Sequence, residues 1–145
     1  MDAPQKLKLR RLLFVALLGL IVLAVVLAAT RRGEWIVPEE ARQRKNPLAS
    51  SAGRQEEARG LYTDYCAKCH GDSGKGDGPD AGKHFTPSGD FTDAARMNAM
   101  TDGELFYKIT EGRRPMPQFK TRLTDDQRWQ LVSFIRSFAS AKDRP

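Results

Sequence analysis

The apolar residues of this chain form one continuous run, followed later by short periodic stretches. The run extends from Leu12 to Ala29, eighteen consecutive uncharged and almost wholly apolar positions. As a helix rising about 1.5 Å per residue, it would cover about 27 Å, close to the hydrocarbon thickness of a bilayer. The pattern therefore predicts one transmembrane helix over residues 12–30, preceded by a basic segment, residues 1–11.

A cleaved signal peptide is the alternative interpretation of this run. The basic residues before it suit both a signal peptide and the cytoplasmic flank of an anchor: Lys6, Lys8, Arg10 and Arg11. Cleavage after Leu27-Ala28-Ala29 is conceivable, but the apolar region of a signal peptide usually has about 7–15 residues, fewer than this run. We therefore expect a retained anchor. Because Arg31 and Arg32 make the second flank basic as well, charge alone does not settle its orientation.

Residues 31–54 have the composition of a linker. They combine mixed charges with few large apolar side chains, and they contain the turn-forming stretches Pro38, Asn46-Pro47 and Ser50 to Gly53. Trp35 lies just beyond the apolar run, where an aromatic ring would meet lipid headgroups or make only an incidental contact. We expect this linker to join the membrane helix to a globular domain, residues 55–145.

Three stretches of the globular part have the period of amphipathic helices. The first is Gln55 to Tyr65, with side chains at i, i+3, i+4 and i+7 that share one face. The second opens with the capping box Thr101 to Glu104 and ends at Gly112. The third follows the capping box Thr124 to Gln127 and covers Arg128 to Ala139. The pattern predicts an all-α domain whose last helix crosses its first.

The positive charge of the chain is concentrated near the predicted membrane segment. The formal net charge is +6. Residues 1–53 hold nine Lys and Arg against four Asp and Glu, whereas the remaining residues hold fifteen against fourteen. A nucleic-acid-binding domain usually has a strongly basic face, so the nearly neutral globular part argues against nucleic acid as a partner.

The stretch Cys66-Ala67-Lys68-Cys69-His70 carries the chemistry. Each cysteine sulfur can add to one haem vinyl group, and the adjoining His70 can bind the iron as its proximal ligand. A zinc site would also need the distant His84, because the chain has two cysteines and two histidines. A thioredoxin-like dithiol would normally follow a strand, whereas the residues before Cys66 have a helical pattern. The motif therefore predicts one haem c attached through Cys66 and Cys69.

The residues around this motif carry a family resemblance. A helix, then Cys-x-x-Cys-His-Gly, then a glycine-rich loop from Gly71 to Pro79 resembles the class I c-type cytochromes of bacterial respiratory chains over residues 55–140. The resemblance implies the cytochrome c fold, and it implies that the carbonyl of Pro79 accepts a hydrogen bond from the His70 ring. It also implies haem attachment outside the cytoplasmic membrane, hence a haem domain on the periplasmic side and residues 1–11 in the cytoplasm. Ala58 departs from the family pattern, which commonly has glycine there.

The resemblance also identifies Met116 as the sixth ligand of the iron. Met116 lies in the stiff stretch Arg113-Arg114-Pro115-Met116-Pro117, ahead of the last helix, as the distal methionine does in class I cytochromes c. Thioether ligation raises the potential of the iron. Met97 and Met100 are expected to pack in the core, and ligation through His84 is the alternative.

With both axial positions filled, the iron can exchange electrons but has no site for substrate. We therefore expect an electron carrier, not an enzyme, which either shuttles between respiratory complexes or is a subunit of one. Its redox partners would dock at basic side chains that bracket Met116, provided that these are more than ordinary solvated charges: Arg113, Arg114, Lys120 and Arg122. The alternative is a haem enzyme or a gas or redox sensor with an open sixth site.

Overall fold

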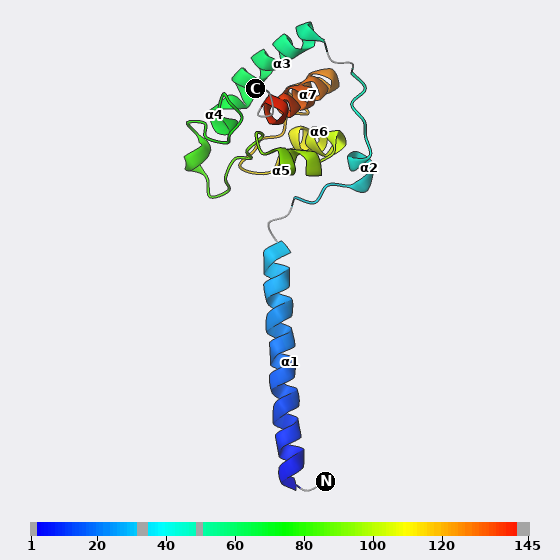
Figure 1. Ribbon diagram of the computed structural model, residues 1–145, viewed down its shortest axis with the longest axis vertical. Coiled ribbons are helices and arrows are strands. Elements are labelled where there is room, and N and C mark those ends of the chain that lie inside the picture. Colours follow the sequence, from blue (N-terminus) through cyan, green and yellow to red (C-terminus); the bar gives the residue numbers. More distant parts are fainter. Residues whose placement is uncertain (1–2, 32–34, 49–50, 142–145) are drawn as a thin grey trace. The chain divides into compact units, whose positions relative to one another are not determined.

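The computed structural model describes residues 3–31, 35–48 and 51–141, and the chain divides into two compact units, Met1–Ile36 and Val37–Pro145 (Figure 1). Every regular element in the described residues is a helix, apart from an isolated backbone bridge between Arg113 and Met116. The predicted all-α class is confirmed.

The first unit contains one long helix, α1 (Ala3–Arg31). Its window Arg10–Leu27 is long and apolar enough to cross a membrane, and none of that window is buried against the rest of the chain. A helical stretch that is apolar on all sides is suited to a lipid environment. It is a candidate membrane span, although a signal sequence has the same properties.

Residues 37–48, which the sequence pattern assigns to a linker, pack on the globular unit. They include the short helix α2 (Glu39–Arg42), which lies against α6 (Asp102–Glu111). Val37 and Ala41 are buried, and the hydroxyl of Thr101 donates to the carbonyl oxygen of Arg42 at 2.7 Å. The sequence pattern did not indicate this packing, because the segment has no clear helical period and its contacts are made with residues far along the chain.

The second half of this segment is also attached to the core. Asn46 Nδ2 donates to the carbonyl oxygen of Trp129 at 3.1 Å and to Ser133 Oγ at 2.9 Å. The guanidinium of Arg44 lies over the Phe106 ring, 4.5 Å from its centroid, and Phe106 stacks on Trp129 at 4.0 Å. The segment is thus fixed by side chains of α6 and α7 (Asp125–Ala141).

Helix α3 (Ala52–Tyr65) packs against α7 and forms the main helix pair of the unit (Figure 1). It begins three residues before the predicted start, where Ser51 Oγ accepts a hydrogen bond from the Arg54 amide. The Tyr62 ring lies 5.3 Å from Phe134 and 5.2 Å from Phe138, both on α7. Ala58, the departure from the family pattern, is completely buried, so its methyl group fits within this packed region. The predicted association of the first and last helices is confirmed.

The capping boxes position α6 and α7. Thr124 and Gln127 make both reciprocal bonds of the box, at 3.0 and 3.2 Å. Thr101 Oγ1 accepts from the Glu104 amide at 3.1 Å, but the buried Glu104 carboxylate pairs with Lys108 at 2.7 Å and Arg42 at 3.6 Å. In the box of Thr101 and Glu104, the acid therefore forms ion pairs, and its contact with Arg42 ties α2 to α6.

The weakly patterned stretch between the haem motif and α6 forms two short helices. They are the 3-10 helix η1 (Ala81–Lys83) and α5 (Ala94–Ala99), whose first turn is capped by Asp93. Arg136 on α7 bonds the carbonyl oxygens of Met97 and Met100 and the Asp102 carboxylate. This single guanidinium fixes α5 against α7. Met97 is completely buried, in agreement with its expected packing role.

Candidate functional site

The two thiols and the imidazole of the motif lie on one turn of helix. Cys66 ends α3 and precedes α4 (Ala67–His70), and its carbonyl oxygen accepts from the amides of Cys69 at 3.1 Å and His70 at 2.9 Å. Residues three and four apart on a helix share a face, so the three side chains are presented together. Both cysteines are free thiols and half-buried. Burial raises the pKa of the Cys66 thiol to about 12, with a smaller contribution from Cys69.

The glycine-rich loop folds back over the end of α4. The amide of Gly76 donates to the carbonyl oxygen of His70 at 2.8 Å, and that of Asp80 to Lys68 at 2.8 Å. A Cβ atom on Gly78 would lie 2.5 Å from the carbonyl oxygens of Ala67 and Lys68, so the backbone can approach this closely because residue 78 has no side chain. The loop thereby satisfies carbonyl groups that the helix end leaves without partners.

The ring of His70 has a hydrogen-bond partner that the sequence did not reveal. Its Nδ1 lies 3.1 Å from the carbonyl oxygen of Gly89. Pro79, the acceptor that the family resemblance implies, is exposed, and its bond to the His70 ring stays a prediction. Gly89 reaches the ring because the chain, after Pro79, passes through η1 and returns past the glycine-rich loop, where the amide of Phe91 donates to the carbonyl oxygen of Gly74 at 2.7 Å.

This contact determines the tautomer of His70. A carbonyl oxygen only accepts hydrogen bonds, so Nδ1 must carry the proton, which leaves the lone pair of Nε2 free to bind a metal. Burial lowers the pKa of His70, and nearby Arg96 lowers it further, while the bond to Gly89 opposes them. The ring is therefore neutral at pH 7, as a metal ligand requires.

Phe91 lies against the same ring. The two ring centroids are 4.4 Å apart and the planes are inclined by 20°, a stacked arrangement. The contact of Phe91 with His70 was not predicted from the sequence. The sequence did contain a signal for the local turn that carries Phe91, because an aspartate two positions before a threonine is typical of such a turn. In the structure, both the amide and the hydroxyl of Thr92 donate to the Asp90 carboxylate at 2.7 Å.

Met116 lies on a separate loop between α6 and α7. Reciprocal backbone bonds join Arg113 and Met116, at 3.0 and 2.9 Å, and close a tight turn that includes Pro115. Its side chain is half-buried and packs against the hydrophobic core, as Phe91 does. Of the other two candidates, Met97 is completely buried and the Met100 sulfur accepts from Lys108 Nζ at 3.3 Å.

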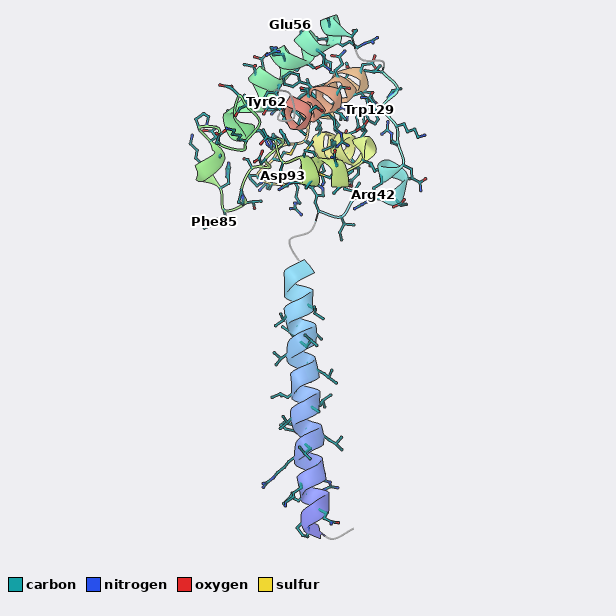
Figure 2. The ribbon with its side chains drawn as sticks, in the orientation of Figure 1. Arg42, Glu56, Tyr62, Phe85, Asp93 and Trp129 are labelled. Carbon is teal, nitrogen blue, oxygen red and sulfur yellow. The ribbon has the colours of Figure 1, made fainter. Side chains whose placement is uncertain are left out.

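Two depressions adjoin the methionine loop. The larger has a volume of about 530 Å³ and lies between residues 83–86 and the two residues that precede Met116. Its lining consists of Lys83, His84, Phe85, Thr86, Arg114 and Pro115. The smaller, about 400 Å³, includes Met116 itself. Figure 2 shows Phe85 at the outer edge of its loop, where the side chain is fully exposed. His84, the alternative ligand, is exposed on the wall of the larger depression.

The predicted docking side chains are all exposed: Arg113, Arg114, Lys120 and Arg122. Lys120 forms an ion pair with Glu111 at 2.8 Å, which offsets part of its charge. The two arginines directly before Pro115 line the depressions, so positive charge borders the methionine loop.

The donor set fits a covalently attached haem. Two thiols on one helical turn match two vinyl groups, and the neutral imidazole beside them has Nε2 available for iron. Among the residues described by the structure, no three His, Cys, Asp or Glu side chains gather as a metal-binding group.

Comparison with known proteins identifies similar domains. The family model described as cytochrome C oxidase, cbb3-type, subunit III, matches residues 53–135. A chain of the Kuenenia stuttgartiensis reducing HAO-like protein complex is 26% identical, with a TM-score of 0.56 over 76% of this chain. The match spans about half of that longer chain, 53%. The KustC0563 c-type cytochrome is 30% identical over 56% of this chain and 95% of its own, with a TM-score of 0.49. No curated protein matches.

Proposed function

The chain belongs to the cytochrome c oxidase, cbb3-type, subunit III family across residues 53–135, and from this premise we propose a membrane-tethered electron carrier whose haem iron is held between His70 and Met116. Class I c-type cytochromes bind haem c covalently through their cysteine motif, and this domain transfers electrons. The bound haem supplies a one-electron redox centre. The protein supplies the attachment, the axial ligands and the surroundings.

The single observation that carries the proposed ligation is the bond between His70 and Gly89. It fixes the proton on Nδ1 and therefore leaves Nε2 as the donor atom toward iron. Cys66 and Cys69, on the same helical turn, would hold the porphyrin beside this ring. The low pKa of His70 favours the neutral ring that ligation needs.

Met116 is the best-supported ligand for the opposite axial position. Met97 is buried in the core and the Met100 sulfur is engaged by Lys108, whereas the thioether of Met116 is half-buried on a loop stiffened by two backbone bonds. A neutral thioether favours the reduced iron. With both axial positions filled, electrons would pass through the haem edge to a partner protein.

We assign α1 to the membrane as a retained anchor, with residues 1–11 in the cytoplasm and the haem domain on the periplasmic side. The exposed apolar window Arg10–Leu27 supports this assignment. Since the folded unit begins at Val37, the connection to the anchor is shorter than residues 31–54. The proposed role is that of a carrier or of a subunit of a larger respiratory oxidoreductase.

Optical spectra of protein produced with haem-maturation machinery would test the ligation. Wild type, Met116→Leu and the matched control Met100→Leu are compared, oxidised and reduced, with and without CO. We expect the far-red iron–sulfur absorption, and no CO binding, in the wild type and the control. Met116→Leu should lose that absorption and bind CO. A wild type that binds CO readily would favour the open-site enzyme or sensor.

A further inference from the structure

Two residues of one loop segment contact the His70 ring in different ways. The carbonyl oxygen of Gly89 accepts from its Nδ1, and the Phe91 ring covers its face at 4.4 Å. The hydrogen bond fixes the direction of one ring atom but still allows the ring to rock about that atom. A parallel aromatic ring restricts this motion, because tilting would drive the edge of the imidazole into it. Together the two contacts define a plane.

Phe91 is itself held by the body of the domain. Its amide donates to Gly74 O at 2.7 Å, and its ring is nearly parallel to that of Phe138 on α7, inclined by 18° with centroids 6.5 Å apart. Phe138 packs in turn on Tyr62 and Phe134, each at 5.2 Å. The orientation of the His70 ring is thus linked through one side chain to the α3–α7 helix pair.

We propose that Phe91 is a positioning residue that sets the plane of the His70 imidazole relative to the haem. This inference rests on the proposed function, in which His70 is the proximal ligand. Groups around a ligating histidine orient its ring and tune the metal. In low-spin ferric haem the plane of the imidazole decides which iron d orbital overlaps its π system. It thereby controls the g-value anisotropy of the electron paramagnetic resonance spectrum and the spread of the haem methyl shifts in the proton NMR spectrum.

Both spectra test the proposal on the full haem-loaded protein. Phe91→Leu and Phe91→Met keep an apolar side chain of similar size but remove the planar face, whereas Phe91→Tyr keeps it. The matched control is Phe134→Leu, which changes the same aromatic cluster at a ring packed on Tyr62 and Phe138. We expect the line at the largest g value to shift and broaden, and the methyl shifts to redistribute, in the Leu and Met variants. Phe91→Tyr and Phe134→Leu should retain the wild-type pattern.

Two results would overturn the role of Phe91. One is a wild-type signal in whichever of the Leu and Met variants incorporates haem, and the other is an equal change in Phe134→Leu. Failure of the proposed function is distinguishable, because the wild type itself would then lack a low-spin ferric signal. A low-spin wild type with an unmoved Phe91→Leu spectrum would contradict the positioning role alone.

Discussion

The hydroxyl of Tyr62 donates a hydrogen bond to the carbonyl oxygen of Gly71 across 2.8 Å. Tyr62 lies in the last turn of α3, and Gly71 immediately follows His70, so this bond joins the core helix to the end of the haem motif. Both groups are buried, and the phenol ring packs on α7 at the same time. One side chain therefore connects three parts of the domain.

Tyr62→Phe should destabilise the domain by about 1–3 kcal/mol, because it leaves a buried carbonyl oxygen without a donor while preserving the aromatic packing. Urea denaturation of the haem-loaded protein measures the change. Tyr65→Phe on the exposed end of the same helix is the control, with an expected change within about 0.5 kcal/mol. Equal stability of Tyr62→Phe and wild type would mean that the hydroxyl contributes nothing to the connection.

The same phenol predicts a loss of stability in alkali. Burial, followed by the nearby charges of Cys66, Asp72 and Asp77, raises the pKa of Tyr62 above its ordinary value of 10.0. In the unfolded chain the phenol ionises near 10, whereas in the fold it stays neutral. Its contribution is therefore fully present below about pH 10 and declines as the pH rises toward the folded pKa.

Comparing Tyr62→Phe with wild type isolates this effect, since phenylalanine does not ionise. The stability advantage of wild type should shrink by up to about 1.4 kcal/mol for each pH unit above 10. Denaturation at pH 8 and pH 11 gives the difference, and phenolate absorption follows the ionisation directly. A constant advantage across this range would contradict a raised pKa in the fold.

Sequence patterns predicted the parts of the fold that are determined locally. Three such features depend only on near neighbours, and the structure contains them: helix α7, the capping box of Thr124 and Gln127, and the helical turn that carries Cys69 and His70. The partner of His70 is different, because Gly89 reaches the ring only after the chain has passed through η1 and returned. Such a contact depends on tertiary folding and has no periodic signature.

The segment 37–48 provides a second instance. Asn46 reaches Trp129 and Ser133 across more than eighty residues of sequence, and nothing in its neighbourhood indicates those partners. The turn-like composition of the segment matched a linker. The side chain of Asn46, however, closes a local turn and bonds a distant helix at once, because its Oδ1 accepts from the Leu48 amide at 3.0 Å while its Nδ2 donates to α7.

Asn46→Ala should therefore destabilise the domain by about 1–2 kcal/mol through the loss of these bonds. Asn98→Ala provides a matched control, because Asn98 is exposed on α5 and the same atoms are removed. Its expected change is within about 0.5 kcal/mol. If residues 37–48 were an unattached linker, the two variants would unfold at the same urea concentration.

Positive charge beside the methionine loop should control electron exchange with small charged reagents. Arg113 and Arg114 are exposed and line the depressions next to Met116. A local positive field attracts an anionic oxidant and repels a cationic one, and salt screens both effects. In Arg113→Gln/Arg114→Gln, oxidation of the ferrous protein by ferricyanide at low salt should slow by about threefold or more.

The control for this experiment removes two charges elsewhere on the same domain. Lys45→Gln/Arg54→Gln alters exposed positions outside both depressions and gives the same net charge. Stopped-flow rates should distinguish the pairs at low salt and converge at about 1 M salt, where the screening length is about 3 Å. A cationic cobalt oxidant should show the opposite trend. If the two double variants slow ferricyanide equally, total charge governs the rate, and electrons do not leave preferentially beside the methionine loop.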